Sequence, residues 1–142
     1  MNPEADQILL TGADQLTTQI APNLASHYLR GAAAVQALLM RFAAREYESG
    51  ADIRATENAD IRALFAELAP MVRDDTLKAR LRAAAATRDI SMTISALNIA
   101  NGELRRLLIV LQIHVEEFGP RDAEKRIWKT LKAMAERRAI SL

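Results

Sequence analysis

The most apolar stretch of the chain covers residues 104–118 and reads LRRLLIVLQIHVEEF. Its large apolar residues recur at steps of three and four, which places them on one face of a helix. These residues are Leu104, Leu107, Leu108, Leu111, Val115 and Phe118, and the face is widened by Ile109, Val110 and Ile113. A helix that is apolar over most of its circumference is usually enclosed by other helices. The stretch therefore predicts the central helix of a bundle.

The composition extends this expectation to the whole chain. Half of the 142 residues are hydrophobic but only 4% are aromatic, so the core must be aliphatic and rich in alanine. Alanine is the best helix former, and glycine and proline are scarce, at 5 and 4 residues. A chain of this length is enough for one self-sufficient core. We therefore expect an all-α, single-domain antiparallel helical bundle of five or six helices over residues 1–142, with the central helix at about 104–118.

Stop and cap residues divide the chain into the expected helices. Asn2 and Pro3 can start the first helix, which Pro22 ends. Gly50 either ends the second helix or lies within a continuation of it, because helical periodicity resumes at once. Residues 89–101 show no clear helical face and are expected to be buried and irregular. The second helix is expected at about 23–49, the third at about 51–68, and the fourth from Asp74 or Asp75. The central helix should end at Gly119-Pro120, and a last helix should follow at about 121–138.

Periodicity also predicts which residues point inward. The third helix should bury Ile53, Ile61, Leu64, Phe65 and Leu68, with Glu57 and Asp60 on or beside that face. The apolar positions of the second helix are Leu24, Tyr28, Ala32, Val35, Leu38, Leu39, Phe42 and, less regularly, Tyr47. The last helix should bury Ile127, Trp128, Leu131, Met134 and Ala135 beneath a basic solvent face.

The cysteine content, the apolar runs and the charge distribution limit where the protein is located and how it associates. The absence of cysteine excludes disulfides and thiol chemistry. The amino terminus has no basic segment before an apolar core, and no apolar run approaches the roughly 20 residues of a membrane span. These features predict a cytoplasmic protein. Residues 1–70 carry 5 Lys or Arg against 9 Asp or Glu, whereas residues 71–142 carry 14 against 9. The first half is therefore acidic and the second half basic. Such opposite charges favour helices of the two halves that face each other, or an association with a partner.

One short string suggests a specific chemistry. Residues 27–33 read HYLRGAA, which resembles the phosphorylatable segment of histidine phosphotransfer domains, His-x-Leu-Lys-Gly-Ser-Ala. The resemblance implies that His27 takes a phosphoryl group, that Arg30 helps to hold it, and that Gly31 lets a response regulator approach. Ala32 replaces the usual serine. In the alternative interpretation His27 is an ordinary helix-surface histidine and Gly31 permits close helix packing.

A metal site is the second chemical alternative. His114 and Glu117 lie one helical turn apart, and Glu46 and Glu57 could join them inside the bundle. Di-iron bundles use paired Glu-x-x-His motifs, whereas this chain has none and has only two histidines. The alternative is a polar pair that sets helix register. We therefore expect no resident cofactor.

Other classes of function find little support in the sequence. The basic last helix has no aromatic platform or DNA-binding motif, and the pI near 8 is modest, so no nucleic-acid partner is expected. There is no Gly-x-Ser-x-Gly motif and no glycine-rich phosphate loop.

Several scattered pieces are similar to a family of small helical bacterial proteins of unknown function, often associated with acyl-CoA dehydrogenase genes. The pieces are residues 20–22 (IAP), 43–46 (AARE), 61–64 (IRAL) and 97–101 (LNIAN), with Gly102 where the family tends to have proline. The resemblance implies a compact helical protein and no particular activity. The sequence thus favours a non-enzymatic protein that acts through a protein partner or as a homodimer. No association with a membrane is expected.

Overall fold

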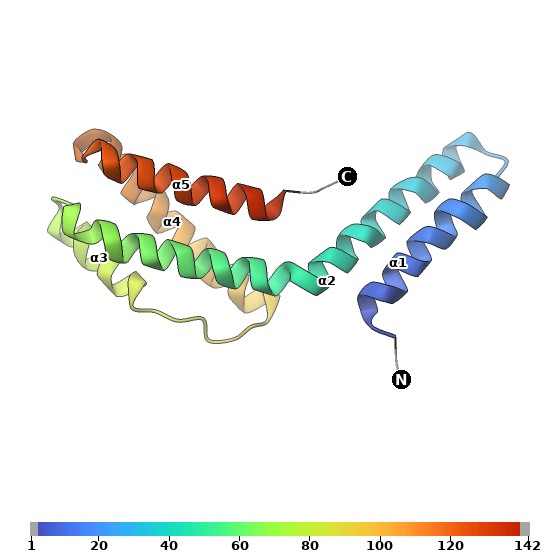
Figure 1. Ribbon diagram of the computed structural model, residues 1–142, viewed down its shortest axis with the longest axis horizontal. Coiled ribbons are helices and arrows are strands. Elements are labelled where there is room, and N and C mark those ends of the chain that lie inside the picture. Colours follow the sequence, from blue (N-terminus) through green and yellow to red (C-terminus); the bar gives the residue numbers. More distant parts are fainter. Residues whose placement is uncertain (1–2, 140–142) are drawn as a thin grey trace. The chain divides into compact units, whose positions relative to one another are not determined.

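The computed structural model describes residues 3–139, and within this range the chain forms helices and no strands. The five α-helices are α1 (Ala5–Gln15), α2 (His27–Leu68), α3 (Asp75–Ala85), α4 (Ile94–Phe118) and α5 (Arg121–Arg138) (Figure 1). A π-helical turn at Leu16–Ile20 and short 3-10 turns at Ala21–Asn23 and Ala69–Met71 end the helices that precede them. The all-α prediction is therefore confirmed. None of the described helices combines the length and the apolar character that a membrane crossing requires.

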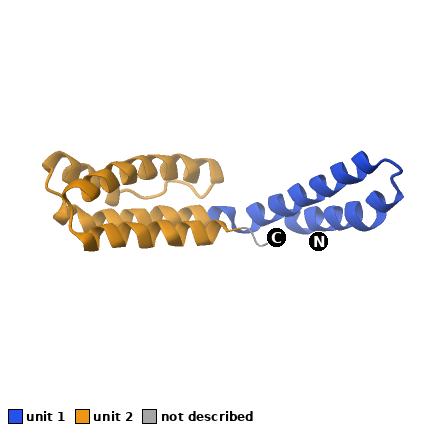
Figure 2. Ribbon diagram, turned by 90° about the horizontal axis from the view of Figure 1, so that it is seen from above, with its two compact units in different colours: residues 1–51 blue, residues 52–142 orange. Residues whose placement is uncertain are grey.

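The chain divides into two compact units, Met1–Ala51 and Asp52–Leu142 (Figure 2). The prediction of a single domain is accordingly not confirmed, and each unit is described by itself. Helix α2 contributes residues to both units. It continues through Gly50, which is buried, so the second and third predicted helices are one helix.

Unit 1 is a hairpin in which α1 lies along the first part of α2 (Figure 1). Its buried residues are small: Ala13 on α1, and Ala33, Ala37 and Ala44 on α2. The helices approach closely at Gly12, where an added Cβ would lie 2.4 Å from Met40 Cε. An ion pair of 2.7 Å between Arg41 and Asp14 joins the two helices at the surface. The hairpin is therefore held by small-residue packing and contains almost no large side chain in its interior.

The ends of these helices follow recognisable local chemistry. The predicted N-cap Asn2 lies outside the described residues, and Glu4 occupies the N-cap position of α1. Pro22 lies in the 3-10 turn that closes the first helical segment, as expected. Ser26 precedes α2, and its Oγ accepts a hydrogen bond from the Leu29 N–H at 3.4 Å. This bond satisfies one of the backbone N–H groups in the first turn of α2 that have no partner within the helix.

Unit 2 has one aliphatic core, to which α4 contributes the predicted leucine face. Leu111 is fully buried, and Leu104, Leu107, Leu108 and Val115 are at most 8% exposed. The second part of α2, α3 and α5 cover this face with Ile61, Leu64, Phe65, Leu68, Leu77, Leu81, Ala123, Ile127 and Met134. The opposite side of α4 is open, however, with Ile109, Ile113 and Phe118 more than half exposed. The prediction of a widened buried face was wrong because three helices cover only one side of α4.

The segment between α3 and α4 differs from the expectation for residues 89–101. Helix α4 begins at Ile94, so residues 94–101 are helical and only residues 86–93 of this connection are irregular. This segment is not buried as a whole, since Ile90 is 96% exposed. Ser95, Asn98 and Asn101 are residue types that favour helix caps, but here they lie inside α4, where their side chains make hydrogen bonds.

The carboxyl end of α4 and both ends of α5 lie where the sequence predicted, but one face of α5 differs from the prediction. Helix α4 ends at Gly119, whose N–H donates to the Val115 carbonyl at 2.9 Å. An added Cβ there would lie 2.8 Å from the Val115 backbone, so a larger residue would not fit. Trp128 is 55% exposed and Ala135 is also exposed, so their predicted burial was wrong.

Leu108→Asp should abolish cooperative folding of unit 2, because it buries a charge that has no partner. The loss should exceed the roughly 2–5 kcal/mol that a buried Leu→Ala change costs. Ile109→Asp is the matched control, since the neighbouring side chain on the same helix is 57% exposed. Urea unfolding followed by circular dichroism measures both. A Leu108→Asp variant that melts as steeply as the control would contradict the placement of this leucine in the core.

Candidate functional site

The phosphotransfer residues lie at the start of α2 in unit 1. His27 is the first residue of α2, and it is exposed, as the motif requires. Arg30 is exposed too, and its Nη1 donates to the Leu24 carbonyl at 3.2 Å. The space around Gly31 is open, with nothing within 4 Å of an added Cβ. Within one chain no helix packs closely against Gly31, and the role of His27 in phosphoryl transfer stays a prediction.

The surroundings of His27 differ from the bundle in which the motif was expected. Unit 1 offers a hairpin of two helices, and His27 lies in the first turn of the second one. Its side chain is accessible but lies at a helix end, whereas the sequence interpretation placed it on the helix of a bundle.

The four metal candidates are not brought together. Glu46 is exposed on the part of α2 in unit 1, and Glu57 is fully buried in unit 2. His114 is half-buried, 5.4 Å from the Phe118 ring, and its Nε2 accepts from the Arg73 N–H at 3.4 Å, whereas Glu117 is exposed. Across residues 3–139 no three His, Cys, Asp or Glu side chains form a group that could hold a metal ion.

Glu57 belongs instead to a buried polar cluster in unit 2. Both oxygens of its carboxylate accept hydrogen bonds from Arg138 of α5, at 2.7 and 2.6 Å. Asn101 of α4 donates to Glu57 at 3.3 Å and to the Asn58 side-chain oxygen at 3.0 Å. Glu57 and Asn58 are fully buried, and Asn101 is 4% exposed. The cluster therefore joins three helices, and of these four side chains only Arg138, which is 41% exposed, reaches the surface.

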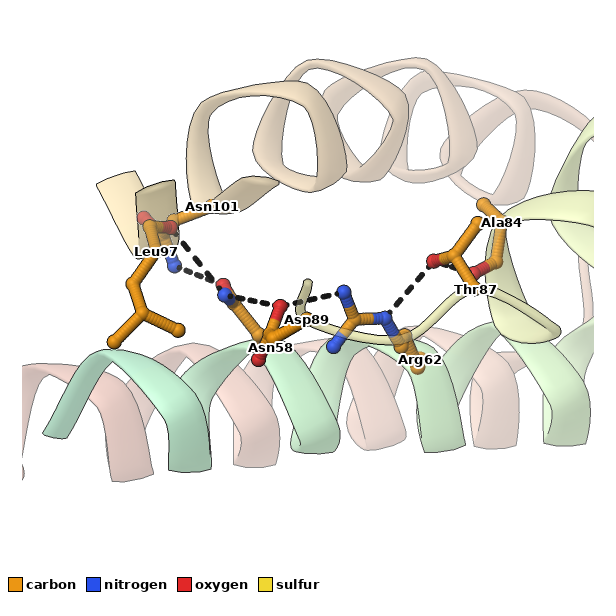
Figure 3. Close-up of polar contacts among 7 residues, drawn as sticks. All are labelled: Asn58, Arg62, Ala84, Thr87, Asp89, Leu97 and Asn101. Carbon is orange, nitrogen blue, oxygen red and sulfur yellow. Dashed lines mark hydrogen bonds and ion pairs between the residues drawn. The ribbon is translucent and has the colours of Figure 1, made fainter. Parts of the chain in front are cut away.

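The cluster continues into the segment between α3 and α4 (Figure 3). Asn58 donates to Asp89 at 3.1 Å and to the Leu97 carbonyl at 3.3 Å. Asp89 also pairs with Arg62 at 2.7 Å, and Arg62 Nε donates to the Thr87 hydroxyl at 3.0 Å. These contacts hold the irregular segment against α2.

The chemistry of this polar cluster is structural. Each of its charged groups has an opposite charge or several hydrogen bonds, as burial requires. No group in it is set up as a nucleophile or as a base beside one. Sequence reasoning placed Glu57 at an apolar face but missed its partners Arg138 and Asn101. The one signal in the sequence for this cluster was a carboxylate at a core position. A buried carboxylate needs a cation beside it, but the sequence does not show which cation the fold brings there.

Two further pairs link α5 to α2. Arg137 pairs with Asp60 beside the cluster. Nearer the surface, Arg126 forms a two-pronged pair with Glu67 at 2.7 and 2.5 Å, with both side chains more than 40% exposed. The hydrogen bond from Arg126 lowers the pKa of the Glu67 carboxyl. Part of the basic face of α5 is thus engaged with the acidic side of α2, as the charge division of the sequence suggested.

The most unusual surface is on the part of α2 that belongs to unit 1. Tyr28, Ala32, Val35, Leu39 and Phe42 follow one another at steps of four and three, and together we call them the α2 stripe. Tyr28 is 81%, Val35 58% and Leu39 52% exposed, and only Phe42 is half-buried.

The α2 stripe lies on the side of α2 away from α1. Ala33 and Ala37 face α1, and at 100° per residue they lie roughly opposite Val35 and Leu39. The prediction that these residues point into the core was therefore wrong: in a single copy of the chain they face the solvent. The helix has two apolar faces, and α1 covers the one lined with alanine because small residues let the helices approach.

No protein-family model, no curated protein and no solved structure matches this chain. Its function must therefore be inferred from its own residues.

Arg138→Ala should lower the free energy of unfolding by about 3 kcal/mol, because it leaves the buried Glu57 carboxylate without its cation. Arg126→Ala is the matched control: it removes an arginine from the same helix that also pairs with a glutamate of α2. Its change should be much smaller, since both charges of that pair stay solvated. Urea unfolding at neutral pH compares the two. Equal losses would show that burial of Glu57 does not govern the stability of unit 2.

Proposed function

We propose that this chain is a non-enzymatic helical protein that pairs with a second copy of itself through the α2 stripe. The single observation that carries the proposal is the exposure of this row of large apolar side chains at heptad spacing. Large apolar patches on a soluble surface commonly mark protein interaction sites.

The interior of unit 1 explains why a partner is needed. Its buried hydrophobic side chains, among the described residues, are the four alanines Ala13, Ala33, Ala37 and Ala44. Burying alanines removes little apolar area, so it stabilises a hairpin only weakly. Two hairpins that bring their α2 stripes together would form an antiparallel four-helix bundle with Val35, Leu39 and Phe42 in its core. The large side chains would then have the surroundings that the sequence pattern predicted.

The charge distribution allows a second copy to pair here. No charged residue lies between Gly31 and Met40, so a two-fold crossing near the middle of the stripe buries no charge. Arg30 and Arg41, the charged residues on either side of this section, lie on other faces of α2, because they are out of step with the stripe at 100° per residue. An uncharged apolar surface of this kind can pack against its own copy, as a two-fold interface requires.

Leu39→Glu should convert the dimer to a monomer, because each interface would then bury two carboxylates without partners. Ala34→Glu is the matched control, since Ala34 is exposed on the same helix but lies outside the stripe. Light scattering during size-exclusion chromatography should give about twice the chain mass of 15.7 kDa for the wild type and the control.

Two results would overturn the proposal. The first is a wild-type protein that is monomeric at every concentration measured. The second is a Leu39→Glu variant that remains a dimer, which would place the interface on another surface.

The exposure of His27 supports phosphoryl transfer as a second candidate function. The open space beside Gly31 also leaves room for a regulator to approach. Incubation with a phosphorylated response regulator should then give an acid-labile label that His27→Gln abolishes, whereas Arg30→Gln should only reduce it. A label that survives in His27→Gln, or no label with any regulator tested, would rule out this candidate.

A further inference from the structure

Unit 2 contains a pocket of about 410 Å³ that is separate from the α2 stripe. It lies between α3, α4 and the irregular segment 86–93, with Arg62 of α2 also lining it. Its volume is within the range of roughly 300–1,000 Å³ that is typical of small-molecule sites.

The pocket is mainly aliphatic. Its apolar lining consists of Ala84, Ile90, Ala96, Ile99, Ala100, Leu104 and Leu107. No aromatic side chain is among them, so the surface suits a flexible hydrocarbon body better than a stacked ring. Ile90 and Ile99 are 96% and 67% exposed, although both line the pocket. An apolar molecule in the pocket would cover surface that water now contacts.

Arg62 supplies a fixed positive group at this site. Its side chain is only 12% exposed, and contacts with Asp89 and Thr87 hold its Nη2 and Nε nitrogens. Figure 3 shows the guanidinium reaching from α2 toward the segment that carries these two residues. Within residues 3–139 the Nη1 nitrogen makes no hydrogen bond to protein. The guanidinium is therefore held in a fixed position in the lining of the pocket, where it can attract an oxyanion.

The other charged residues of the lining favour an anion. Arg80 and Arg88 are exposed and line the pocket together with one acid, Glu103. Asp89 neutralises Arg62 but is not among the lining residues. The pocket thus combines an excess of positive charge with an apolar wall on α4.

We propose that this pocket binds a small aliphatic carboxylate. The carboxylate is held by the guanidinium groups of Arg62 and Arg88, and the hydrocarbon lies against Ala100 and Leu104. Arg62 is held in advance by the buried polar cluster, so little side-chain entropy is lost when the ligand binds. The irregular segment carries both Arg88 and Ile90, and it can therefore contact both ends of such a ligand.

Octanoate, below its micelle concentration, is the probe for this site. Titration calorimetry of the full chain should give saturable binding with one ligand per chain. Octan-1-ol should bind at least about tenfold more weakly, because it loses the charge-assisted hydrogen bonds, and octylamine should not bind. In amide NMR spectra the shifts should cluster at Thr87, Arg88, Ala100 and Glu103. Non-saturable binding, equal affinity for octan-1-ol, or shifts centred on the α2 stripe would each overturn the proposal.

Two variants locate the ligand independently. Arg88→Gln should weaken octanoate binding about tenfold without altering the fold, because its side chain is exposed. Arg105→Gln removes an exposed arginine that does not line the pocket, and it should leave the affinity unchanged. Ala100→Phe should block binding by filling the pocket, with circular dichroism confirming the helices. Binding that survives in Ala100→Phe, or equal affinities for Arg88→Gln and Arg105→Gln, would show that octanoate binds elsewhere.

Discussion

The packing of α4 on the second part of α2 is the interaction on which unit 2 depends. Leu111 of α4 belongs to the same core cluster as Phe65 and Ile61 of α2, and all three side chains are completely buried. Hydrophobic burial of this kind is the main favourable term in folding, but it does not by itself select one helix register. Helices with long aliphatic faces can slide by a turn at modest cost.

The buried polar cluster supplies that selection. Glu57 and Asn58 on α2 meet Asn101 on α4 and Arg138 on α5, and every one of these contacts is directional. A shift of one helical turn would leave a carboxylate or an amide buried without a partner, which costs several kcal/mol. We infer that the cluster fixes the register of the three helices. It also holds Arg62, so the architecture of the core extends directly to the pocket.

Unit 1 presents the opposite situation. Its helices are joined through alanines, while its large side chains, such as Val35 and Leu39, remain in water. A hairpin cannot enclose both faces of a helix, because one neighbour covers only one side. The exposed face, together with an interior that contains only small side chains, is the physical reason for proposing a second copy there, whereas unit 2 encloses a core of large side chains of its own.

The amino-acid sequence alone determined the helical class, the proline and glycine helix ends, and the leucine face of α4, because these follow from local propensity and periodicity. Only the tertiary structure decided which of two apolar faces α2 buries, because both faces have the same helical period. It likewise decided that Arg138 partners Glu57, since 81 residues separate them and no local rule joins such positions. The pocket depends on Arg62, α3 and α4 meeting around an irregular segment, and periodicity cannot anticipate a junction of this kind.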